Sequence, residues 1–467
     1  MEIVLWWIRR DLRLSDNPAL LAARQTGLPV LPVFILDPAL LALHAPVRQA
    51  FLFGGLRDLD KDLARLGASL VLRRGQPLQV LQGLLVETGA VFIFAEEDYS
   101  PYARSRDAEI ARHLPLQLVN GLSVHPPAAV HKPDGKPYTV FTPFSKAWKA
   151  LPLPAPQETP RAEINFAAAP QVFSEPLPAL PLPPAFPPGE AEAERRLEHF
   201  LSGPVEFYAV ERNRMDLEGT SQLSPYLRFG MISPRRAVWR TLQVAAQLPS
   251  EARSGAETFL NELIWREFYL SILYHFPDVL KTAFQPAYRS IPWRDDPREI
   301  KAWQEGLTGY PVVDAAMRQL SGLGWMHNRA RMITASFLVK DLLVNWQHGE
   351  RWFMRWLVDG DPAANNGGWQ WTAGTGTDAA PYFRIFNPVS QGLKFDPQGQ
   401  YIRRWVPELA KLPDEFIHTP WLMPEDAARQ VGFRPGLDYP LPIVEHQQAK
   451  ERTLAAYAAA RKFYQAE

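Results

Sequence analysis

The side chains most able to do chemistry are concentrated between residues 359 and 388. Acids, amides and indoles alternate there with glycines: Asp359, Asp361, Asn365, Asn366, Trp369 and Trp371. Gathered in one segment without clear periodicity, they predict a loop that grips a buried polar ligand. A helix-capping loop explains the glycines and Asn366 equally well. It does not explain two acids together with two tryptophans.

A second cluster places three different functional groups at helical spacing. Asn328 and Met332 are four residues apart, which predicts that they share one face of a helix, with Arg331 beside them. An amide, a thioether and a guanidinium would then face one point.

A third cluster contains Glu262 and Arg266, also four residues apart, with Trp265 between them. On a helix, these residues could form a functional surface with an acid, a base and an indole. A surface ion pair next to a core tryptophan explains the same pattern equally well.

Arginines are concentrated between residues 212 and 240. The run contains Arg212, Arg214, Arg228, Arg235, Arg236 and Arg240 against two acids, Asp216 and Glu218. A local excess of positive charge is what a phosphate backbone attracts. Taken singly, each of these arginines fits a solvated helix face better.

Composition and motifs exclude several common chemistries. The chain has no cysteine, which removes disulfides, thiolate nucleophiles and Cys-ligated zinc. Its histidines lack the spacing of a zinc protease, and neither a Gly-x-Ser-x-Gly elbow nor a Walker loop occurs. Residues 374–379 match a loose dinucleotide fingerprint but follow no predicted strand, so they predict a turn. We therefore expect no metal site and no ordinary hydrolase chemistry.

The elements that position these residues follow from hydrophobic periodicity. Apolar runs predict strands at residues 3–8, 30–36, 69–73, 90–94 and 116–119, and helical spacing predicts helices at 18–24, 47–66, 78–87 and 102–112. This alternation predicts an α/β fold, a doubly wound parallel sheet with right-handed crossovers. Such sheets bind ligands at the carboxyl ends of their strands.

The later part of the chain has helical periodicity almost throughout. Helices are predicted at residues 190–201, 234–246, 256–276, 311–321, 329–346, 350–357 and 453–464. Before them, residues 151–188 contain 12 prolines, which exclude helix interiors and central strands. We therefore expect an α/β domain at residues 1–128, a Pro-rich linker at 129–190 and an all-α domain at 191–467.

The overall composition fits a globular cytoplasmic protein. The 50 basic and 50 acidic residues cancel, so any nucleic-acid site must be a local basic patch. Residues 1–8 are apolar but too short for a membrane helix and lack a preceding basic region. Together with the absence of cysteine, this favours the cytoplasm. The chain also has 15 tryptophans, a number that suggests a role beyond packing.

Four sequence blocks together resemble the DNA photolyase/cryptochrome family. They are the Trp-x-Arg-x-Asp-Leu-Arg-Leu-x-Asp-Asn run at residues 7–17, the Glu-Gly-Thr-Ser-x-Leu-Ser segment at 218–224, and the blocks at 325–332 and 361–388. The likeness spans essentially the whole chain. Within the family, the chain looks most like a class I cyclobutane pyrimidine dimer photolyase.

The resemblance implies an FAD folded into a U shape inside the helical domain. Side chains and turn amides would hold its diphosphate region: Tyr208, Thr220, Ser221, Gln222, Leu223 and Ser224. Others would line the isoalloxazine and the adenine: Trp265, Arg266, Asn328, Arg331, Asp359, Asp361 and Asn365. Of these, Asn365 would face flavin N5, and Asp359 would form an ion pair with Arg331.

The resemblance also implies a substrate. Members that repair (6-4) photoproducts carry histidines where this chain has Asn328 and Met332, because that chemistry needs a proton donor. Cleaving a cyclobutane dimer needs only an electron, given by excited reduced FAD and then returned. The dimer would be flipped out of the duplex. The residues that would contact it and the surrounding DNA are Arg212, Glu262, Trp265, Arg329, Met332, Trp371 and Arg384.

Three tryptophans match the family's electron-transfer chain from flavin to surface. They are Trp369, Trp346 and Trp293. Core packing explains any one of them alone, whereas three at matching positions favour an electron route.

The antenna region departs from the folate-binding pattern. Folate-antenna members place an Asn-Glu pair before an Arg-x-Arg-Asp segment, where this chain has Tyr102 and Ala103. We therefore expect a second chromophore of the deazaflavin or flavin type in preference to folate.

The main alternative is a cryptochrome-type photoreceptor that binds FAD but does not repair DNA. Signalling members usually carry an extension beyond the shared core, whereas this chain ends at residue 467, soon after the predicted helix at 453–464, which favours the enzyme. A dark flavoprotein oxidoreductase is disfavoured because no Rossmann fingerprint occurs. We expect a monomer that binds dimer-containing DNA and needs neither a membrane nor an obligatory protein partner.

Overall fold

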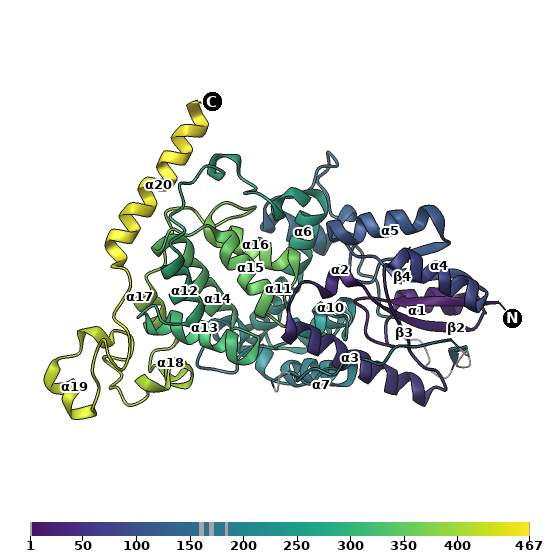
Figure 1. Ribbon diagram of the computed structural model, residues 1–467, viewed down its shortest axis with the longest axis horizontal. Coiled ribbons are helices and arrows are strands. Elements are labelled where there is room, and N and C mark those ends of the chain that lie inside the picture. The colour runs from purple at the N-terminus through teal and green to yellow at the C-terminus, as the bar shows by residue number, and fades with distance from the viewer. Residues whose placement is uncertain (1, 158–162, 168–171, 183–184, 467) are drawn as a thin grey trace. The chain divides into compact units, whose positions relative to one another are not determined.

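The computed structural model describes residues 2–157, 163–167, 172–182 and 185–466 (Figure 1). The chain groups into two compact units. Unit 1 comprises Met1–Ala209, Ser221–Pro277 and Val358–Ala363, and unit 2 comprises Val210–Thr220, Asp278–Leu357 and Ala364–Glu467. Within the described ranges, none of the helices combines the length and the low polarity needed to cross a membrane.

Unit 1 contains a parallel sheet of five strands in the order β3-β2-β1-β4-β5. The strands are β1 (Ile3–Ile8), β2 (Val30–Leu36), β3 (Val71–Arg74), β4 (Ala90–Glu96) and β5 (Leu116–Val119). Both β1 and β2 are buried along their whole length, as expected for a parallel sheet covered on both faces. The predicted strands and the doubly wound α/β fold are confirmed.

The helices that connect the strands begin at proline or capping residues. They are α1 (Pro18–Gln25), α2 (Pro38–Leu41), α3 (Pro46–Arg65), α4 (Pro77–Thr88) and α5 (Pro101–His113). Each has proline in its first turn, where the missing N–H is not needed. Helices α4 and α5 pack against each other, and Figure 1 shows them side by side.

Most of the remaining helices of unit 1 lie around the long helix α11 (Ser250–His275). The remaining helices other than α11 are α6 (Phe141–Ala150), α7 (Glu190–Leu201), α8 (Tyr208–Glu211), α9 (Ser224–Arg228) and α10 (Pro234–Gln247), of which α8 runs across the unit boundary. Glu267 of α11 is 5% exposed and accepts hydrogen bonds from the backbone N–H groups of Val124 and His125 and from Trp148 Nε1 at 2.6 Å. One buried carboxylate therefore ties α6 and the segment before it to α11.

The segment after α6 runs beside the sheet. The backbone N–H of Ala167 donates to the Val30 carbonyl, and that of Glu175 donates to the Leu72 carbonyl, both at 2.9 Å. Ser174 Oγ accepts from the Leu72 N–H, also at 2.9 Å. The described residues of this segment form neither an α-helix nor a strand with its own place in the sheet. Residues 158–162, 168–171 and 183–184 of the predicted linker lie outside the described residues.

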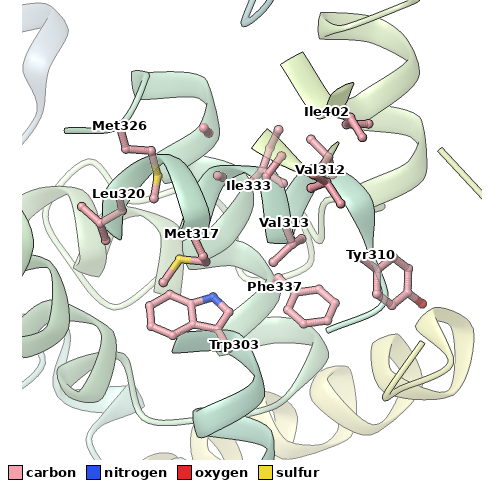
Figure 2. Packing of buried hydrophobic residues seen from close by; sticks show 14 of the residues in the cluster. Trp303, Tyr310, Val312, Val313, Met317, Leu320, Met326, Ile333, Phe337 and Ile402 are labelled. Atoms are coloured by element: carbon pink, nitrogen blue, oxygen red, sulfur yellow. The ribbon is translucent and has the colours of Figure 1, made fainter. Parts of the chain in front are cut away.

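Unit 2 is helical. Its helices are α12 (Pro297–Glu305), α13 (Pro311–Leu323), α14 (Asn328–Ser336), α15 (Trp346–Trp356), α16 (Pro362–Ala373), α17 (Pro388–Phe395), α18 (Gln400–Trp405), α19 (Glu425–Val431) and α20 (His446–Ala466), with the first two residues of α16 assigned to unit 1. Figure 2 shows the core, where Trp303 lies beside Met317 and Phe337. The Trp303 indole N–H donates to the Thr334 carbonyl at 3.0 Å, so its one polar group is satisfied.

The helix predicted at 329–346 is wrong, because the chain breaks there. After α14, residues Phe337–Asp341 form a π-helical turn, and Leu343 has a φ of 53°, in the left-handed region. Asn345 then caps α15 by accepting from the Gln347 N–H at 3.0 Å. The break lies in a stretch that is buried throughout, so hydrophobic periodicity carries no sign of it. Trp346 consequently begins a new helix.

The loop predicted between residues 359 and 388 is wrong at residues 362–373, because these form α16. Pro362 occupies the first position, and Asp361 caps the helix by accepting a backbone N–H of the first turn at 2.9 Å. The buried side of α16 includes Asn366 and Gln370, whose amides both donate to the Val279 carbonyl. These polar residues on a buried face hide the helix from a hydrophobic pattern. The turn predicted at 374–379 is confirmed.

Trp369 of α16 packs against a glycine of α15. Its indole is 2% exposed and makes edge-to-face contacts with Trp303 and Phe353. A Cβ atom at Gly349 would lie 2.0 Å from Trp369 Cη2. The close approach of the two helices therefore requires glycine at this position.

We expect Gly349→Ala to lower the free energy of unfolding by about 1–3 kcal/mol, because the added methyl overpacks a buried indole. The matched control is Gly83→Ala in α4, where a Cβ meets nothing within 4 Å. That change should leave the stability unchanged or raise it by up to about 1 kcal/mol. Chemical denaturation followed by circular dichroism measures both, and equal effects of the two substitutions would contradict this packing.

Candidate functional site

Two acids of the segment Val358–Ala363 are held by side chains from other parts of unit 1. Asp361 Oδ2 lies 2.6 Å from Arg10 Nη2, at the carboxyl end of β1. Asp359 Oδ2 accepts a hydrogen bond from Ser224 Oγ, also at 2.6 Å. Three predicted ligand residues, Asp359, Asp361 and Ser224, are thus brought together, and Arg10 joins them.

Guanidinium groups and carboxylates both surround these acids. The guanidinium groups are those of Arg10, Arg48, Arg228 and Arg266, and the carboxylates are those of Glu96, Asp98, Glu267, Asp359 and Asp361. Burial and repulsion from Arg10 lower the pKa of Arg228 to about 9. Although burial opposes its charge, Asp98 has a pKa below its usual range because Arg10 lies beside it. All four arginines keep their charge at pH 7.

This arrangement suits an anionic ligand. In the described part of the chain, the buried Nη1 of Arg228 has no hydrogen-bond partner. A buried donor without an acceptor costs about 1–3 kcal/mol, which a phosphate oxygen would recover.

Arg10, Arg48, Arg228 and Asp98 were not among the predicted ligands. A signal existed for Arg10, which follows a predicted strand at the edge where doubly wound sheets bind ligands. No comparable signal marks Arg48, a buried basic residue within the amphipathic helix α3.

The predicted diphosphate segment forms a turn that leads into α9. Gln222 has a φ of 51° and accepts from Arg196 Nη1 at 3.1 Å. Leu223 is buried, and Tyr208 packs edge-on against Phe200. Ser221 to Ser224 belong to unit 1, whereas Thr220 is assigned to unit 2. The segment therefore has the irregular backbone, with hydroxyl side chains that are partly or fully exposed, that a phosphate-binding turn needs.

On α11, three predicted residues have different environments. Arg266 donates to the carbonyls of Leu122 and Leu227, and burial lowers its pKa. It is therefore an internal tie of unit 1 and not half of a surface ion pair. Glu262, Trp265 and Arg266 are all partly exposed.

In unit 2, helix α14 presents the predicted amide and thioether on one face. Asn328 Nδ2 lies 4.0 Å from Met332 Sδ, which confirms the predicted pairing. Arg331 Nε donates to the Met326 carbonyl at 2.9 Å. His327 caps the helix by accepting from the Arg329 N–H, and burial lowers the pKa of His327 to about 4, so it is neutral at pH 7.

Two predicted DNA-binding arginines are neighbours in unit 2. Burial, together with repulsion from Arg212, lowers the pKa of Arg329 to about 10. Arg329 Nη2 donates to Asn213 Oδ1 at 2.6 Å, and its guanidinium lies 4.4 Å from the centre of the Phe395 ring. Trp371 is partly exposed and Arg384 is exposed. These residues keep polar or planar surfaces available to a ligand.

The arginine run between residues 212 and 240 is not a free basic patch. Five of its arginines pair with acids: Arg214 with Asp216, Arg228 with Asp361, Arg235 with Asp16, Arg236 with Glu194 and Arg240 with Glu198. Most of these acids lie outside residues 212–240, so the count of charged residues within that run overstated its positive charge. Of these pairs, Arg235–Asp16 is buried and ties two segments of unit 1 together.

The three predicted tryptophans all lie in unit 2, where neighbouring residues link Trp369 to Trp346 and Trp346 to Trp293. Trp369 packs on Gly349, which is one helical turn from Trp346 on α15. The residues before Trp346 are bonded to those after Trp293: the Arg294 N–H donates to the Leu343 carbonyl, and the Asn345 N–H donates to Asp295 Oδ1. Trp369 and Trp346 are buried, whereas Trp293 is partly exposed. The series thus leads from the core toward solvent.

Asn365 and Asn366 are adjacent on α16 and bond to different partners. The Asn365 amide donates to the Glu350 carbonyl at 3.0 Å, whereas the Asn366 amide donates to the Val279 carbonyl. Asn366 is 3% exposed and therefore serves the core. Asn365 is partly exposed.

Comparisons with known proteins agree across the chain. Residues 4–161 match the family model for DNA photolyase, and residues 259–459 match that for the FAD binding domain of DNA photolyase. The chain is 42% identical to a deoxyribodipyrimidine photo-lyase of Agrobacterium fabrum, with 98% of each chain covered. It is 43% identical to that of Escherichia coli, covering 99% of this chain and 100% of the relative.

Solved structures give the same result. A bacterial class III photolyase from Agrobacterium tumefaciens matches with a TM-score of 0.92 and 40% identity, covering 99% of this chain and 98% of that one. A cryptochrome from Synechocystis sp. PCC6803 matches with a TM-score of 0.88 and 29% identity, covering 98% of this chain and 99% of that one. The chain therefore belongs to the DNA photolyase family.

Proposed function

We propose that the protein uses light to repair cyclobutane pyrimidine dimers in DNA. The name of its relatives, deoxyribodipyrimidine photo-lyase, gives the general substrate. The observation that carries the choice of dimer is the Asn328–Met332 pair, an amide and a thioether on one face of α14. Neither group is a proton donor of the strength that a histidine would supply, and splitting a cyclobutane ring requires none.

FAD is the cofactor we assign, with the binding residues that the family resemblance implies. They are Tyr208, Thr220, Ser221, Gln222, Leu223, Ser224, Trp265, Arg266, Asn328, Arg331, Asp359, Asp361 and Asn365. The guanidinium groups around Asp361 and the unsatisfied Arg228 Nη1 fit its diphosphate. The chemistry that reduced FAD supplies when bound is a light-driven electron for the dimer. The ion pair between Asp359 and Arg331 stays a prediction.

The protein's own residues would bind and orient the dimer. Glu262 would accept a hydrogen bond from the pyrimidine edge, while Trp265 and Trp371 offer planar surfaces to the flipped-out bases. Arg212, Arg329 and Arg384 would contact phosphates, which fixes the position of the duplex without reading its sequence. We assign this activity to a cytoplasmic monomer that acts without a protein partner.

The tryptophan series would restore the active state of the cofactor after oxidation. In this proposal Trp293, Trp346 and Trp369 carry an electron inward from the surface. The graded exposure of the three indoles supports the direction.

A second chromophore is part of the proposal, of the deazaflavin or flavin type. Unit 1 has a cavity of about 350 Å³, a volume within the range of small-molecule sites. Its lining includes Tyr99, Arg104 and Tyr274, with the Arg104 guanidinium 4.2 Å from the centre of the Tyr274 ring. A flat aromatic ligand would suit these groups.

For the flavin site, Asp361→Ala and Arg331→Ala should each weaken FAD binding about 5- to 150-fold, because a buried charged partner is left unsatisfied at about 1–3 kcal/mol. Asp361→Ala also removes the partner of Arg10 and the cap of α16. Titration of the apoprotein with FAD measures the affinity. Asp426→Ala, at an exposed acid of α19, is the control and should have no effect. Full FAD affinity in both site variants would remove this flavin site.

To test the repair activity, the flavin of the protein is first reduced chemically. The protein should then remove cyclobutane dimers from DNA under blue light and leave them in place in the dark. A chromatographic assay of dimers gives the answer. A cryptochrome-type photoreceptor, which the Synechocystis likeness makes the second candidate, would bind FAD yet leave the dimers intact in both conditions. Loss of dimers in the dark would also rule out the proposal.

For the tryptophan series, Trp369→Phe should abolish light-driven reduction of oxidised flavin while repair continues with chemically reduced flavin. Phenylalanine keeps much of the packing but is far harder to oxidise. Absorbance at flavin wavelengths during illumination measures the reduction. Trp356→Phe on α15, outside the series, is the control. An unchanged rate in Trp369→Phe would show that electrons take another route.

A further inference from the structure

Phe141 and Trp265 form a flat aromatic stack in unit 1. Their ring centres are 3.7 Å apart and their planes differ by 5°. Phe141 is the first residue of α6, and Trp265 lies in the middle of α11. Both side chains are partly exposed. The indole that we assign to the dimer is therefore already in contact with another ring.

The stack is not needed to hold α6 on α11. Phe144 is 1% exposed and packs edge-on against Phe268 at 5.3 Å. Trp148 is also 1% exposed and donates to Glu267 at 2.6 Å. These two buried contacts fix the helix pair. Phe141 adds a contact at the partly exposed end of the interface.

The geometry of the stack limits what Trp265 can do. Aromatic side chains usually meet offset or edge-on, so a nearly parallel pair at this distance is a specific arrangement. Phe268 meets the Trp265 ring at 84°, with the centres 5.5 Å apart, which restricts its rotation further. One face of the indole is closed to any base by Phe141, and its plane is held.

We propose that Phe141 is a positioning residue for damage recognition: it covers one face of Trp265 and holds the indole in the plane that the flipped-out dimer contacts. This inference rests on the proposed function. An ordered ring loses less conformational entropy on binding than a mobile one, so Phe141 would strengthen dimer binding without touching the dimer. Undamaged duplex, whose bases stay stacked, gains nothing from it.

The test compares Phe141→Leu with Phe141→Tyr in the full-length, FAD-loaded protein. Leucine keeps apolar volume but offers no planar face, whereas tyrosine keeps the ring. Binding is measured to dimer-containing DNA and to undamaged DNA of the same sequence. We expect Phe141→Leu to weaken dimer binding about two- to tenfold. Binding to undamaged DNA, the melting temperature and the repair rate at saturating dimer should stay unchanged, and Phe141→Tyr should behave as the wild type.

Thr142→Ala, at the exposed neighbour on α6, is the control and should match the wild type. The inference would be overturned by equal losses for both DNAs in Phe141→Leu, by no loss at all, or by tighter dimer binding. The last would mean that Phe141 occupies the place of the dimer. A loss that Phe141→Tyr does not rescue would also count against it.

Trp265→Ala separates this inference from the proposed function. If it loses dimer binding selectively while Phe141→Leu does not, Phe141 has no positioning role and the repair function stands. If Trp265→Ala binds both DNAs as the wild type does and repair persists, the dimer lies elsewhere and the inference fails with it. Absence of light-dependent repair in the wild type would instead reject the function.

Discussion

Buried charges at the carboxyl end of β1 organise unit 1. Arg13 pairs with Glu96 at the end of the neighbouring strand β4, at 2.6 Å, and Arg10 pairs with Asp98 and Asp361. Removing one partner of a buried pair costs about 3–5 kcal/mol, so the Arg13–Glu96 pair, which is buried on both sides, must form for the chain to fold. Arg10, Asp98 and Asp361 are half-buried. Asp361 follows Arg10 by 351 residues. The carboxyl end of β1 is thus occupied by the protein's own charges, which hold the segment Val358–Ala363 of the proposed flavin site.

Helix α11 shows how neighbouring residues divide structural and functional work. Glu267 accepts hydrogen bonds from the backbone N–H groups of Val124 and His125, and Arg266 donates to the Leu122 carbonyl, so both residues hold other segments against α11. Trp265, next to them, stays partly exposed. Because α11 is fixed by its neighbours, the indole is carried by a rigid element. Binding surfaces on rigid elements lose less order when a ligand arrives.

The sequence allowed the sheet to be predicted because its strands are short apolar runs between helices that begin at proline. Prediction from the sequence failed where the structure depends on contacts between residues far apart in the chain. The break at Leu343 lies in a uniformly buried stretch, and α16 buries amides that bond to a backbone carbonyl. Residues of the candidate site were found through motifs, with their spacing on α14 confirmed. The pairing of Arg10 with Asp361 was missed because hydrophobic periodicity gives no information on contacts between residues 351 positions apart.

The proline-rich segment has a consequence for self-association. Strand β3 is at one edge of the sheet, and an uncovered edge offers its N–H and C=O groups to a strand of another molecule. Here Ser174 and Glu175 take the hydrogen bonds of Leu72, and Pro176 and Pro178 follow at once. Prolines have no N–H to donate, so the covering segment cannot serve as the next edge. The β3 edge of the sheet is thus covered by a segment of the same chain. This cover protects the protein in concentrated solution from forming intermolecular β-structure at the β3 edge.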